Sequence, residues 1–390
     1  MRRVRLKEIG TFYSGLSGKS KSDFSEGNAL LVTYRNIFNN PVLNPAIKDT
    51  VVVGKDEKQN EVLWGDILIT GSSETPADAG MSSVVLFNPQ EKMYLNSFCF
   101  GFRLNDMNEA LPSYIGHLLR STSIRAAISK TAFGVTRFNV NRMRFADIEI
   151  PLPPLNIQKE IVSILDSFTS LIDKMKQEVE MRKKQMEYYR EKLMAPQKNW
   201  EIKTLGEIGT FTRGNGLQKS DFRVKGFPCV HYGQIHTYYN TCIYKTKSFC
   251  EEDLAKKLQK ASYGDLLIAT TSEDVKACCK AAVWFGAGDV AYSGDSFCYS
   301  HDQDPKYMAY LFQTEMFAKQ KQKAATGAKV IRVSGESMAS FSFAFPPLVQ
   351  QRQIASILDT FETYISKLEK MIELRQKQYE YYREKLLTFE

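Results

Sequence analysis

The chain has 390 residues, with 52 Lys and Arg against 44 Asp and Glu, and a formal net charge of +8. A hydrophobic content of 43% and a charged content of 25% are ordinary for globular domains and exclude a disordered chain. No stretch approaches the roughly 18 uncharged apolar residues of a membrane span, and the basic N-terminus lacks the apolar core of a secretory signal. Seven cysteines without a framework spacing favour free thiols, so we expect a cytoplasmic protein of two or three domains.

The chain repeats itself. EYYREKL occurs at 187–193 and at 380–386, and EIGTF occurs at 8–12 and at 207–211. Further matches are GDILI at 65–69 with GDLLI at 264–268, SFC at 97–99 and 296–298, PPL at 153–155 and 346–348, and ILDSF at 164–168 with ILDTF at 357–361. The offset is 199 early and 193 late, and we place the change between Phe100 and Tyr114. Matches in the same order at nearly one spacing indicate an internal duplication.

The repeat predicts four parts. We expect a first module at 1–152, a helix at 153–195, a second module at 196–345 and a second helix at 346–390. Each module has about 150 residues, a suitable size for one hydrophobic core.

Each module has the pattern of mixed α and β structure. In the first module, β-rich runs are expected at 30–32, 51–53, 66–70, 84–87 and 98–102, with Gly, Pro, Asn and Ser between them. A helical stretch at 113–129 follows, and its counterpart in the second module is 305–323. The fold class is therefore predicted to be α+β, with two similar mixed α/β modules separated by two long helices.

The two helical segments carry a coiled-coil seam, because apolar residues recur every three and four positions for more than four heptads. The first residues of each seam are Ile161, Leu165, Phe168 and Ile172, and then Ile354, Leu358, Phe361 and Ile365. Arg182 and Arg375 interrupt the seams at matching places. Each is either a long side chain that reaches out to water or a device that fixes the register.

The helices are expected to pair antiparallel, because no long loop near Pro196 would let one of them double back. Residues 161–193 would span about 50 Å at 1.5 Å per residue. Such a pairing predicts an approximate internal two-fold axis, with the two modules at opposite ends of a rigid spacer.

The loops of the modules diverge between the copies and carry residue types that suit nucleic acid. Lys and Arg neutralise phosphates, whereas Arg, Asn and Gln can make paired hydrogen bonds to base edges. In the first module the candidates are Lys19, Lys21, Tyr34, Arg35, Asn36, Ser72, Ser73, Glu74, Arg137, Asn139 and Arg142. In the second they are Arg213, Asn215, Gln218, Lys219, His231, Tyr232, Gln234, Ser272, Glu273, Lys329 and Arg332. Any one of them could equally be a solvated surface group, and only their clustering at aligned positions favours an interface.

The chain resembles a known family, the DNA-sequence specificity subunits of type I restriction–modification systems. The resemblance rests on GDILI and GDLLI, on IEIPLPPLNIQKEIVSILDSF at 148–168 with FAFPPLVQQRQIASILDTF at 343–361, and on the helices that end in EYYREKL. RGNGLQKSDF at 213–222 and HYGQIHTYYN at 231–240 also look like one of the family's recognition-domain types. The resemblance covers essentially the whole chain, and both halves match independently.

The resemblance implies that each module is a target recognition domain that reads one half of a bipartite, asymmetric double-stranded DNA site. It implies that the paired helices set the spacer and dock two methyltransferase subunits, and that restriction subunits can join. S-adenosylmethionine, ATP and Mg²⁺ would then belong to the partner subunits, with no cofactor in this chain. Two heads in the major groove on one face of the duplex favour half-site centres about 10 bp apart.

The signatures of a DNA-modifying enzyme are missing. Asn40-Pro41 and Asn44-Pro45 lack the second proline of an adenine methyltransferase motif, and there is no phosphate-binding P-loop. Asp265, Asp274 and Lys276 match a nuclease pattern only loosely, and Pro76 stands at the lysine position of the first copy. Cys229, His231, His236, Cys242 and Cys250 lie within 22 residues but lack a Cys-x-x-Cys pair, so we predict no metal site.

Three functions follow from the sequence. The first is a non-catalytic DNA-reading subunit of a multisubunit enzyme, and the second is a coiled-coil assembly scaffold that reads no DNA. The third, a self-sufficient DNA-modifying enzyme, would require S-adenosylmethionine binding by the isolated chain, which we expect to be absent.

Overall fold

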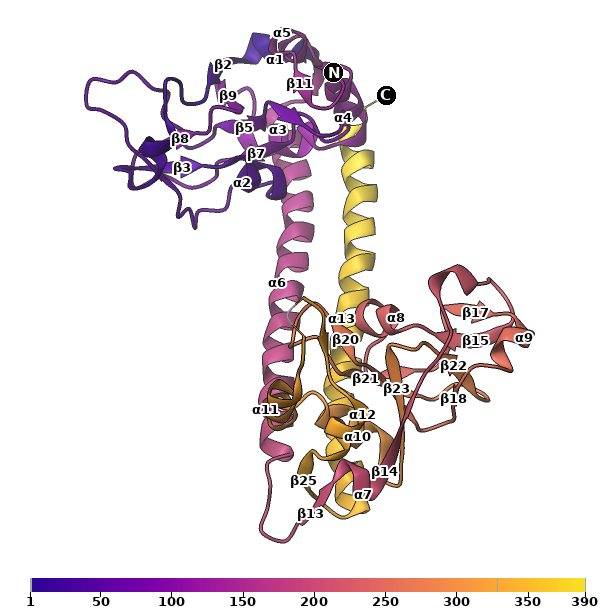
Figure 1. Ribbon diagram of the computed structural model, residues 1–390. Coiled ribbons are helices and arrows are strands. Elements are labelled where there is room, and N and C mark those ends of the chain that lie inside the picture. The colour runs from indigo at the N-terminus through magenta and orange to yellow at the C-terminus, as the bar shows by residue number, and fades with distance from the viewer. Residues whose placement is uncertain (1, 328, 390) are drawn as a thin grey trace. The chain divides into compact units, whose positions relative to one another are not determined.

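The computed structural model describes residues 2–327 and 329–389. The chain forms two compact units: unit 1 comprises residues 1–176 and 370–390, and unit 2 comprises residues 177–369. Each unit holds one module together with a segment of each long helix, α6 (Leu155–Leu193) and α13 (Leu348–Leu387) (Figure 1). The long helices are therefore shared between the units, and each unit is described by itself below.

Unit 1 is built on a central antiparallel sheet in the order β2-β9-β5-β7 and a smaller sheet in the order β4-β3-β8 (Figure 1). The strands of these sheets are β2 (Gly10–Ser14), β9 (Cys99–Leu104), β5 (Ile67–Thr70), β7 (Ser82–Val84), β4 (Thr50–Val51), β3 (Ala29–Val32) and β8 (Met93–Leu95). Short ladders join β1 (Arg2–Arg5) to β12 (Glu149–Leu152), and β10 (Ala132–Phe133) to β11 (Phe138–Val140) to β6 (Ser72–Ser73). The helices of the module are α1 (Leu6–Ile9), the 3₁₀ turn η1 (Lys21–Phe24), α2 (Tyr34–Asn39), α3 (Pro112–Leu119), α4 (Thr122–Ser129) and α5 (Arg142–Ala146).

The central strand β5 is covered on both faces. Its side chains alternate: Ile67 and Ile69 join a core cluster with Phe100 and Phe102, whereas Leu68 joins a second cluster with Val32. Side chains of a strand point alternately to the two faces of a sheet, so a continuous apolar run is what this doubly covered position requires.

Unit 2 repeats this order of elements with extra strands. The central sheet runs β14 (Gly209–Arg213), β23 (Ser296–His301), β19 (Leu266–Ala269), β21 (Lys280–Trp284) and β16 (Cys242–Ile243). The second sheet runs β17 (Ser248–Cys250), β15 (Phe227–Val230), β22 (Val290–Tyr292) and β18 (Lys260–Ala261), and short ladders pair β13 (Glu201–Thr204) with β25 (Ser342–Phe345) and β20 (Thr271–Ser272) with β24 (Ile331–Arg332). The helices are α7 (Leu205–Ile208), the 3₁₀ turn η2 (Lys219–Asp221), α8 (Tyr232–Thr237), α9 (Glu252–Ala255), α10 (Pro305–Leu311), α11 (Glu315–Ala324) and α12 (Gly335–Ala339). The predicted fold class, mixed α/β modules with two long helices, is confirmed.

One part of the repeat alignment was wrong. In unit 1, Ile69 pairs with Phe100, and in unit 2 the equivalent Ile268 pairs with Phe297. Phe100 therefore corresponds to Phe297 at an offset of 197, and the two SFC segments are out of register by two residues. A slip of two preserves the in-and-out alternation of a strand, so the sequence pattern could not expose it.

The expected single helices are each broken in two. In unit 1, α3 ends at Leu119 and α4 begins at Thr122, and in unit 2 the break lies between α10 and α11. Thr314 is the N-cap residue of α11, with its hydroxyl accepting the backbone N–H of Phe317. Ser and Thr favour such caps over helix interiors, which explains the break in unit 2, whereas Ser121, the N-cap residue of α4, makes no side-chain cap bond.

Two expected strands are displaced. The strand expected at 51–53 is Thr50–Val51, because the backbone N–H of Val53 is taken by the side chain of Asn28 at 2.8 Å. The strand expected at 84–87 is Ser82–Val84, and Val85 instead exchanges backbone hydrogen bonds with the turn at Gly65 and Asp66. Contacts with distant loops therefore decide where these strands end.

The long helices pack antiparallel in each unit. In unit 1, Phe168 of α6 stacks on Tyr382 of α13 with ring centroids 5.4 Å apart, and in unit 2 Tyr189 of α6 stacks on Phe361 of α13 at 5.6 Å. The other seam residues named from the sequence are buried: Ile161, Leu165, Ile172, Ile354, Leu358 and Ile365. Ile161 and Leu165 belong to the hydrophobic core of the first module, and Ile354 and Leu358 belong to that of the second. The N-terminal part of each long helix therefore packs into the module that precedes it in the chain.

Arg182 and Arg375 are half-buried at the seams. Arg182 forms an ion pair with Glu178, with Nε 2.7 Å from Oε1, and its guanidinium lies 5.5 Å from the ring centroid of Tyr364. Arg375 donates to Gln378 of its own helix at 2.6 Å. Both charged groups thus have polar partners on their own helix, as expected of a side chain that carries its charge out of an apolar seam.

Candidate nucleic-acid interface

A groove of about 580 Å³ in unit 1 brings together predicted residues from three distant segments. Tyr34 comes from the start of α2, Ser72, Ser73 and Glu74 come from β6 and the following loop, and Arg137 comes from the β10–β11 hairpin. The side chains of the groove also include Phe38, Thr75, Asp78, Asn96, Phe98 and Thr136. The groove therefore combines one cation, two carboxylates, hydroxyl and amide groups and aromatic rings.

Arg137 is the organising cation of this groove. Its Nε donates to Ser72 Oγ at 3.0 Å, and its guanidinium lies 5.2 Å from the ring centroid of Phe98. Phe98 is 59% exposed, and Val135 at the hairpin tip is 90% exposed. The Arg137 guanidinium is exposed and held in place from one side, an arrangement that suits a group that must meet a ligand from solvent.

The hairpin that carries Arg137 depends on Gly134. The φ of Gly134 is 133°, which residues with a side chain rarely adopt. A Cβ there would also lie 2.0 Å from the carbonyl oxygen of Arg137. The next strand, β11, pairs with β6 so that Asn139 lies opposite Ser72. This ladder places the predicted 72–74 and 137–139 segments side by side.

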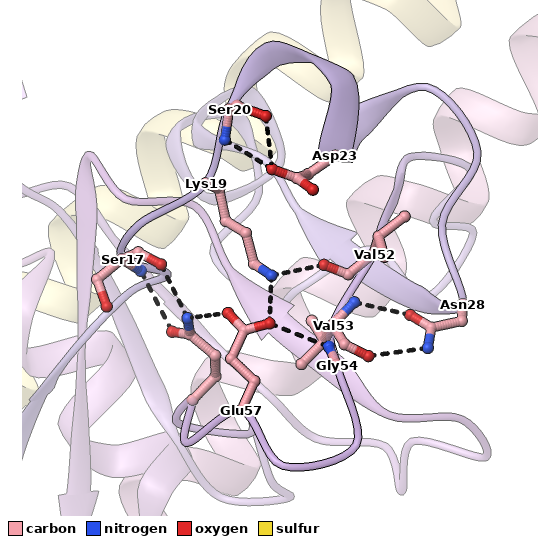
Figure 2. Close-up of polar contacts among 10 residues, drawn as sticks. Ser17, Lys19, Ser20, Asp23, Asn28, Val52, Val53, Gly54 and Glu57 are labelled. Carbon is pink, nitrogen blue, oxygen red and sulfur yellow. Dashed lines mark hydrogen bonds and ion pairs between the residues drawn. The ribbon is translucent and has the colours of Figure 1, made fainter.

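Lys19, one of the residues expected to contact DNA, is engaged by groups of its own unit. Its ammonium donates to the backbone carbonyl of Val52 at 2.7 Å and to Glu57 Oε2 at 2.5 Å (Figure 2). The lysine side chain is only 9% exposed. Hydrogen bonds from the Lys19 and Gln59 side chains and the backbone N–H of Gly54 lower the pKa of Glu57 to about 2. The pair fastens two loops of unit 1 together.

The remaining predicted residues of unit 1 divide into exposed and structural groups. Lys21 and Arg35 are exposed. Asn36 exchanges hydrogen bonds with the backbone of Asn44 at 3.1 Å in each direction and so shapes its own loop. Arg142 donates to Ser14 Oγ at 2.8 Å, and burial lowers the pKa of its guanidinium.

In unit 2, predicted residues converge on the loop 293–295. Arg213 Nε donates to the carbonyl of Gly294 at 3.1 Å, and the backbone N–H of Tyr232 donates to Ser293 Oγ at 2.9 Å. Thr271, next to Ser272 in β20, donates its hydroxyl to Asp295 Oδ1 at 3.3 Å. The equivalent loop of unit 1, at the offset of 197, contributes Asn96 and Phe98 to the groove described above.

The β20–β24 ladder places Arg332 opposite Thr271, next to this loop. Glu273 and Lys329 are exposed on the segments that the ladder joins, and Ser272 accepts the backbone N–H of Asp274 at 3.3 Å. Gly327 is the counterpart of Gly134: its φ is 101°, and a Cβ there would lie 2.1 Å from the carbonyl oxygen of Val330. Both units therefore present a glycine-dependent hairpin beside the same loop.

His231 caps α8 and packs against Tyr232, with ring centroids 4.4 Å apart and the rings tilted by 38°. Its Nδ1 accepts the backbone N–H of Gly233 at 3.1 Å, and burial, together with the positive charge of Lys219, lowers its pKa. The side-chain amide of Gln234 donates to the hydroxyl of Ser248, with Nε2 2.7 Å from Oγ. These groups shape the helix start rather than extend freely into solvent.

Asn215 bridges two loops through the backbone of Lys257 and Gln259, at 2.9 and 2.8 Å. Gln218 and Lys219 are exposed at the start of η2. Of these three predicted residues, only the last two leave their side chains free for a ligand.

Sequence reasoning missed the loop at the centre of each site. Phe98 was missed because the sequence pattern places it in the β-rich run at 98–102, whereas strand β9 begins at Cys99. Asn96 and Asp295 were missed because neither is basic nor part of a cluster. The signal available in the sequence was a large aromatic residue directly before a strand of buried residues.

Three further observations concern membrane spans, metal ligands and a carboxylate of the first module. Among residues 2–327 and 329–389, no helix is long and apolar enough to span a membrane. The same residues contain no group of three or more His, Cys, Asp and Glu side chains arranged to hold a metal ion. Asp66, the counterpart of Asp265 in the first module, is fully buried, where its carboxylate accepts the backbone N–H of Leu63 at 2.8 Å and pairs with Arg103.

Comparison with known proteins places both halves of the chain in one family. The model of the type I restriction modification DNA specificity domain matches twice, at residues 1–181 and 197–376. A Haemophilus influenzae protein assigned as a type I restriction enzyme specificity subunit is 30% identical over 66% of this chain and 68% of its own length. The specificity subunit of an Escherichia coli type I restriction enzyme is 28% identical over 62% of this chain, and the match spans 63% of that protein, slightly less than two thirds.

Solved structures agree on the fold. A type I restriction–modification S subunit from M. genitalium aligns over 100% of this chain and 96% of its own, with a TM-score of 0.56 and 14% identity. A chain from a study of assembly and conformational transition in the type I system aligns over 99% and 97%, with a TM-score of 0.60 and 14% identity. The duplicated domain, the shared long helices and these matches together show that the chain belongs to the family of type I restriction–modification specificity subunits.

Proposed function

We propose that this specificity subunit reads a bipartite double-stranded DNA site, one half through the groove of unit 1 and the other through the equivalent face of unit 2. The observation that carries the proposal is the convergence of separate segments on one loop in each unit. Residues 96–98 meet β6 and the Arg137 hairpin in unit 1. Residues 293–295 meet Arg213, Tyr232 and β20 in unit 2.

The two faces differ in chemistry at equivalent positions. Phe98 of unit 1 corresponds to Asp295 of unit 2, at the offset of 197 fixed by the strand pairing. In the major groove an apolar ring favours the methyl group of thymine, whereas a carboxylate accepts from the exocyclic amine of cytosine. Such a difference supports the reading of two unlike half-sites.

The helices support a role in assembly. In unit 1, Ile164 and Leu171 of α6 and Leu374 and Tyr381 of α13 are exposed apolar side chains. The residues that the 193-residue offset makes equivalent in unit 2 are also exposed: Ile357, Tyr364, Met181 and Tyr188. Tyr364 and Ile357 line a groove of about 560 Å³ with Arg182, Thr360 and Phe361. Two equivalent apolar surfaces support the docking of two copies of one partner.

We propose that these partners are two methyltransferase subunits, joined by restriction subunits in complexes that cleave DNA. S-adenosylmethionine, ATP and Mg²⁺ then bind to the partners, and this chain supplies sequence choice without catalysis, in the cytoplasm. The equal helix spacers set the number of unread base pairs between the half-sites. The domain limits that go with this proposal are 1–152 and 196–345 for the recognition domains and 153–195 and 346–390 for the spacer helices.

The test is to map methylated bases across the genome of a host that carries the partner subunits, with and without this chain. The expected result is one asymmetric sequence with two specified parts and an unspecified gap, present only with the chain. A footprint of the reconstituted complex should show two protected patches. Methylation that does not depend on the chain, or binding without sequence preference, would instead support an assembly scaffold.

A further inference from the structure

Three sulfur atoms meet in the core of unit 2, at the base of the loop that carries Ser272 and Glu273. Cys278 Sγ lies 3.9 Å from Cys279 Sγ, and Cys279 Sγ lies 4.0 Å from Met338 Sδ. All three side chains are almost completely buried. Cys278 and Cys279 line a cavity of about 540 Å³, so a small solute has space beside the thiols.

A buried cation lies next to these thiols. Lys321 is 6% exposed, and its Nζ donates to the carbonyl oxygens of Lys276 at 2.9 Å and Cys278 at 2.8 Å. Within residues 2–327 and 329–389, Lys321 forms no ion pair with a carboxylate. A buried charge normally has a compensating partner, and the groups that face the Lys321 ammonium are the thiols of Cys279 and Cys278 and the carboxylate of Asp274.

Cys279 also has an unusual backbone. Its φ of 62° makes it the single non-glycine residue with a positive φ in the described part of the chain. The equivalent residue of unit 1, at the offset of 199, is Gly80 with a φ of 68°. Unit 1 thus uses the residue that this conformation favours, whereas unit 2 keeps a strained cysteine. Such strain persists where a side chain has a task beyond packing.

The whole environment has changed together between the two units. A Cβ on Gly80 would meet Ile128 and Phe145, and Ala79 precedes Gly80 in the core. The equivalent residues of unit 2 are Cys278, Cys279, Lys321 and Met338. Three sulfur-containing side chains and a lysine therefore replace an entirely apolar set. Filling a core would not require the lysine, because burying an ammonium group is costly.

We propose that Cys278, Cys279 and Met338 form a binding site for one soft monovalent cation of the Cu(I) class. Three sulfur ligands about 2.3 Å from an ion in one plane lie about 4.0 Å from one another, a spacing that the Cys278–Cys279 and Cys279–Met338 pairs already have. Thiolate and thioether ligands select Cu(I). Closing a disulfide would instead require the cysteine sulfurs to approach to about 2.05 Å.

Binding follows a balanced reaction. The two S–H bonds break, two thiolate–ion bonds form, and two protons pass to solvent for each ion bound. Two thiolates, one monovalent ion and the Lys321 ammonium then sum to zero net charge, so the buried group is neutral. The bound ion would tie the start of β21 to α12 at the base of the 273–277 loop.

The test is an anaerobic titration of the reduced full-length chain with Cu(I), in competition with a chromogenic Cu(I) chelator. The expected result is one ion bound per chain, a thiolate-to-copper absorption band in the near ultraviolet and the release of two protons per ion. Cys278→Ser should abolish binding. Cys279→Gly should do the same while folding well, because glycine accepts the left-handed backbone. Met338→Leu should weaken binding by at least tenfold.

The matched control is Cys250→Ala. Cys229 and Cys250 are a second pair of neighbouring buried thiols in unit 2, outside the proposed site. This variant should retain one tightly bound ion. The proposal is overturned if the wild-type chain takes no ion from the chelator, if Cys278→Ser binds as the wild type does, or if Cys250→Ala removes the ion. None of these results depends on DNA reading.

Discussion

Glu384 of α13 accepts the backbone N–H of Thr122, with its two carboxylate oxygens 3.0 and 2.9 Å from the nitrogen. Thr122 opens α4, so a side chain more than two hundred residues away caps this helix. In unit 2, Glu191 does the same for Glu315 at the start of α11, with both oxygens at 3.2 Å. Both glutamates belong to EYYREKL, and the repeat of that segment is explained by this shared contact.

Replacing Glu384 with Gln should destabilise unit 1 by about 0.5–1 kcal/mol, because a negative charge is lost from the positive end of a helix. Amide hydrogen exchange should accelerate in the first turn of α4. Glu380→Gln, an exposed change on the same helix, is the control and should leave α4 unchanged. Equal effects of the two substitutions would show that general charge, rather than the cap, is responsible.

Gly134→Ala should disrupt the hairpin of unit 1, since the added Cβ would collide with the carbonyl oxygen of Arg137. Substitution at a positive φ costs about 1–2 kcal/mol even without a collision. Gly18→Ala separates the two effects, because Gly18 has a φ of 68° and no atom within 4 Å of a new Cβ. Thermal denaturation should rank Gly134→Ala as the more harmful change, and a reversed order would contradict the role of the close contact.

Phe98→Ala and Asp295→Asn should change the methylated sequence in different half-sites. Each loss of a base contact is expected to cost about 1–3 kcal/mol of discrimination at one position. The measurement is the genome-wide methylation pattern of each variant. Arg3→Ala, an exposed change on β1, should leave both half-sites intact. Loss of discrimination in the same half-site for both variants would refute the assignment of one face to each half.

Unit 2 should lose stability in mild acid. Burial is the main cause that lowers the pKa values of His231, His236 and His301. The unfolded chain then binds protons more tightly than the folded one, so stability falls as the pH drops below about 6.5. Urea denaturation at pH 7 and pH 5 should show this loss, and His301→Gln should reduce it. A pH-independent midpoint for unit 2 would disprove the prediction.

The stability of unit 1 should depend on pH in a more acidic range. The low pKa of Glu57, about 2, reflects its hydrogen bonds to Lys19 and Gln59. The folded carboxylate holds its proton more weakly than the unfolded one, so its contribution is present above about pH 4.5 and is lost as the pH falls toward 2. Glu57→Gln should flatten the acid response of the 15–60 region in hydrogen exchange. An unchanged response would mean that other carboxylates control this region.

Deleting one heptad from α6 alone should abolish the original specificity. Phe168 and Tyr189, which stack on α13 residues in unit 1 and unit 2, are 21 residues apart, and their partners Phe361 and Tyr382 are also 21 residues apart. Removing residues 174–180 shortens one helix by about 10.5 Å and leaves the spans unequal. Removing the equivalent 367–373 as well should restore assembly with altered half-site spacing. Methylation of the original site by the single deletion would contradict the role of the helices.

The parts of the fold that local pattern controls could be predicted. The seam from Ile161 to Ile172 follows from apolar periodicity alone, and the buried strand Ile67–Thr70 follows from its continuous apolar run. The sequence could not show that Ser121 interrupts a helix, because the break depends on the distant Glu384. It also could not reveal the two-residue slip at Phe98, since a slip of two leaves every side chain on its expected face.

The candidate site was predictable in composition but not in detail. The clusters around Tyr34, Ser72 and Arg137 could be listed from their residue types, and the fold brings them to one groove. Lys19 did not stay free, because Glu57 lies 38 positions further along the chain and no local pattern connects the two. Charged residues can be listed from a sequence, but whether each is already paired depends on contacts that only the fold creates.

The division of the long helices also governs the order in which the protein is completed on the ribosome. Unit 2 is a continuous stretch, 177–369, and can close as soon as it has emerged. Unit 1 requires residues 370–390, and Leu387 fills part of its core. The first module to be synthesised is therefore the last to be finished, and it must wait with an exposed apolar surface until the final helical turns arrive.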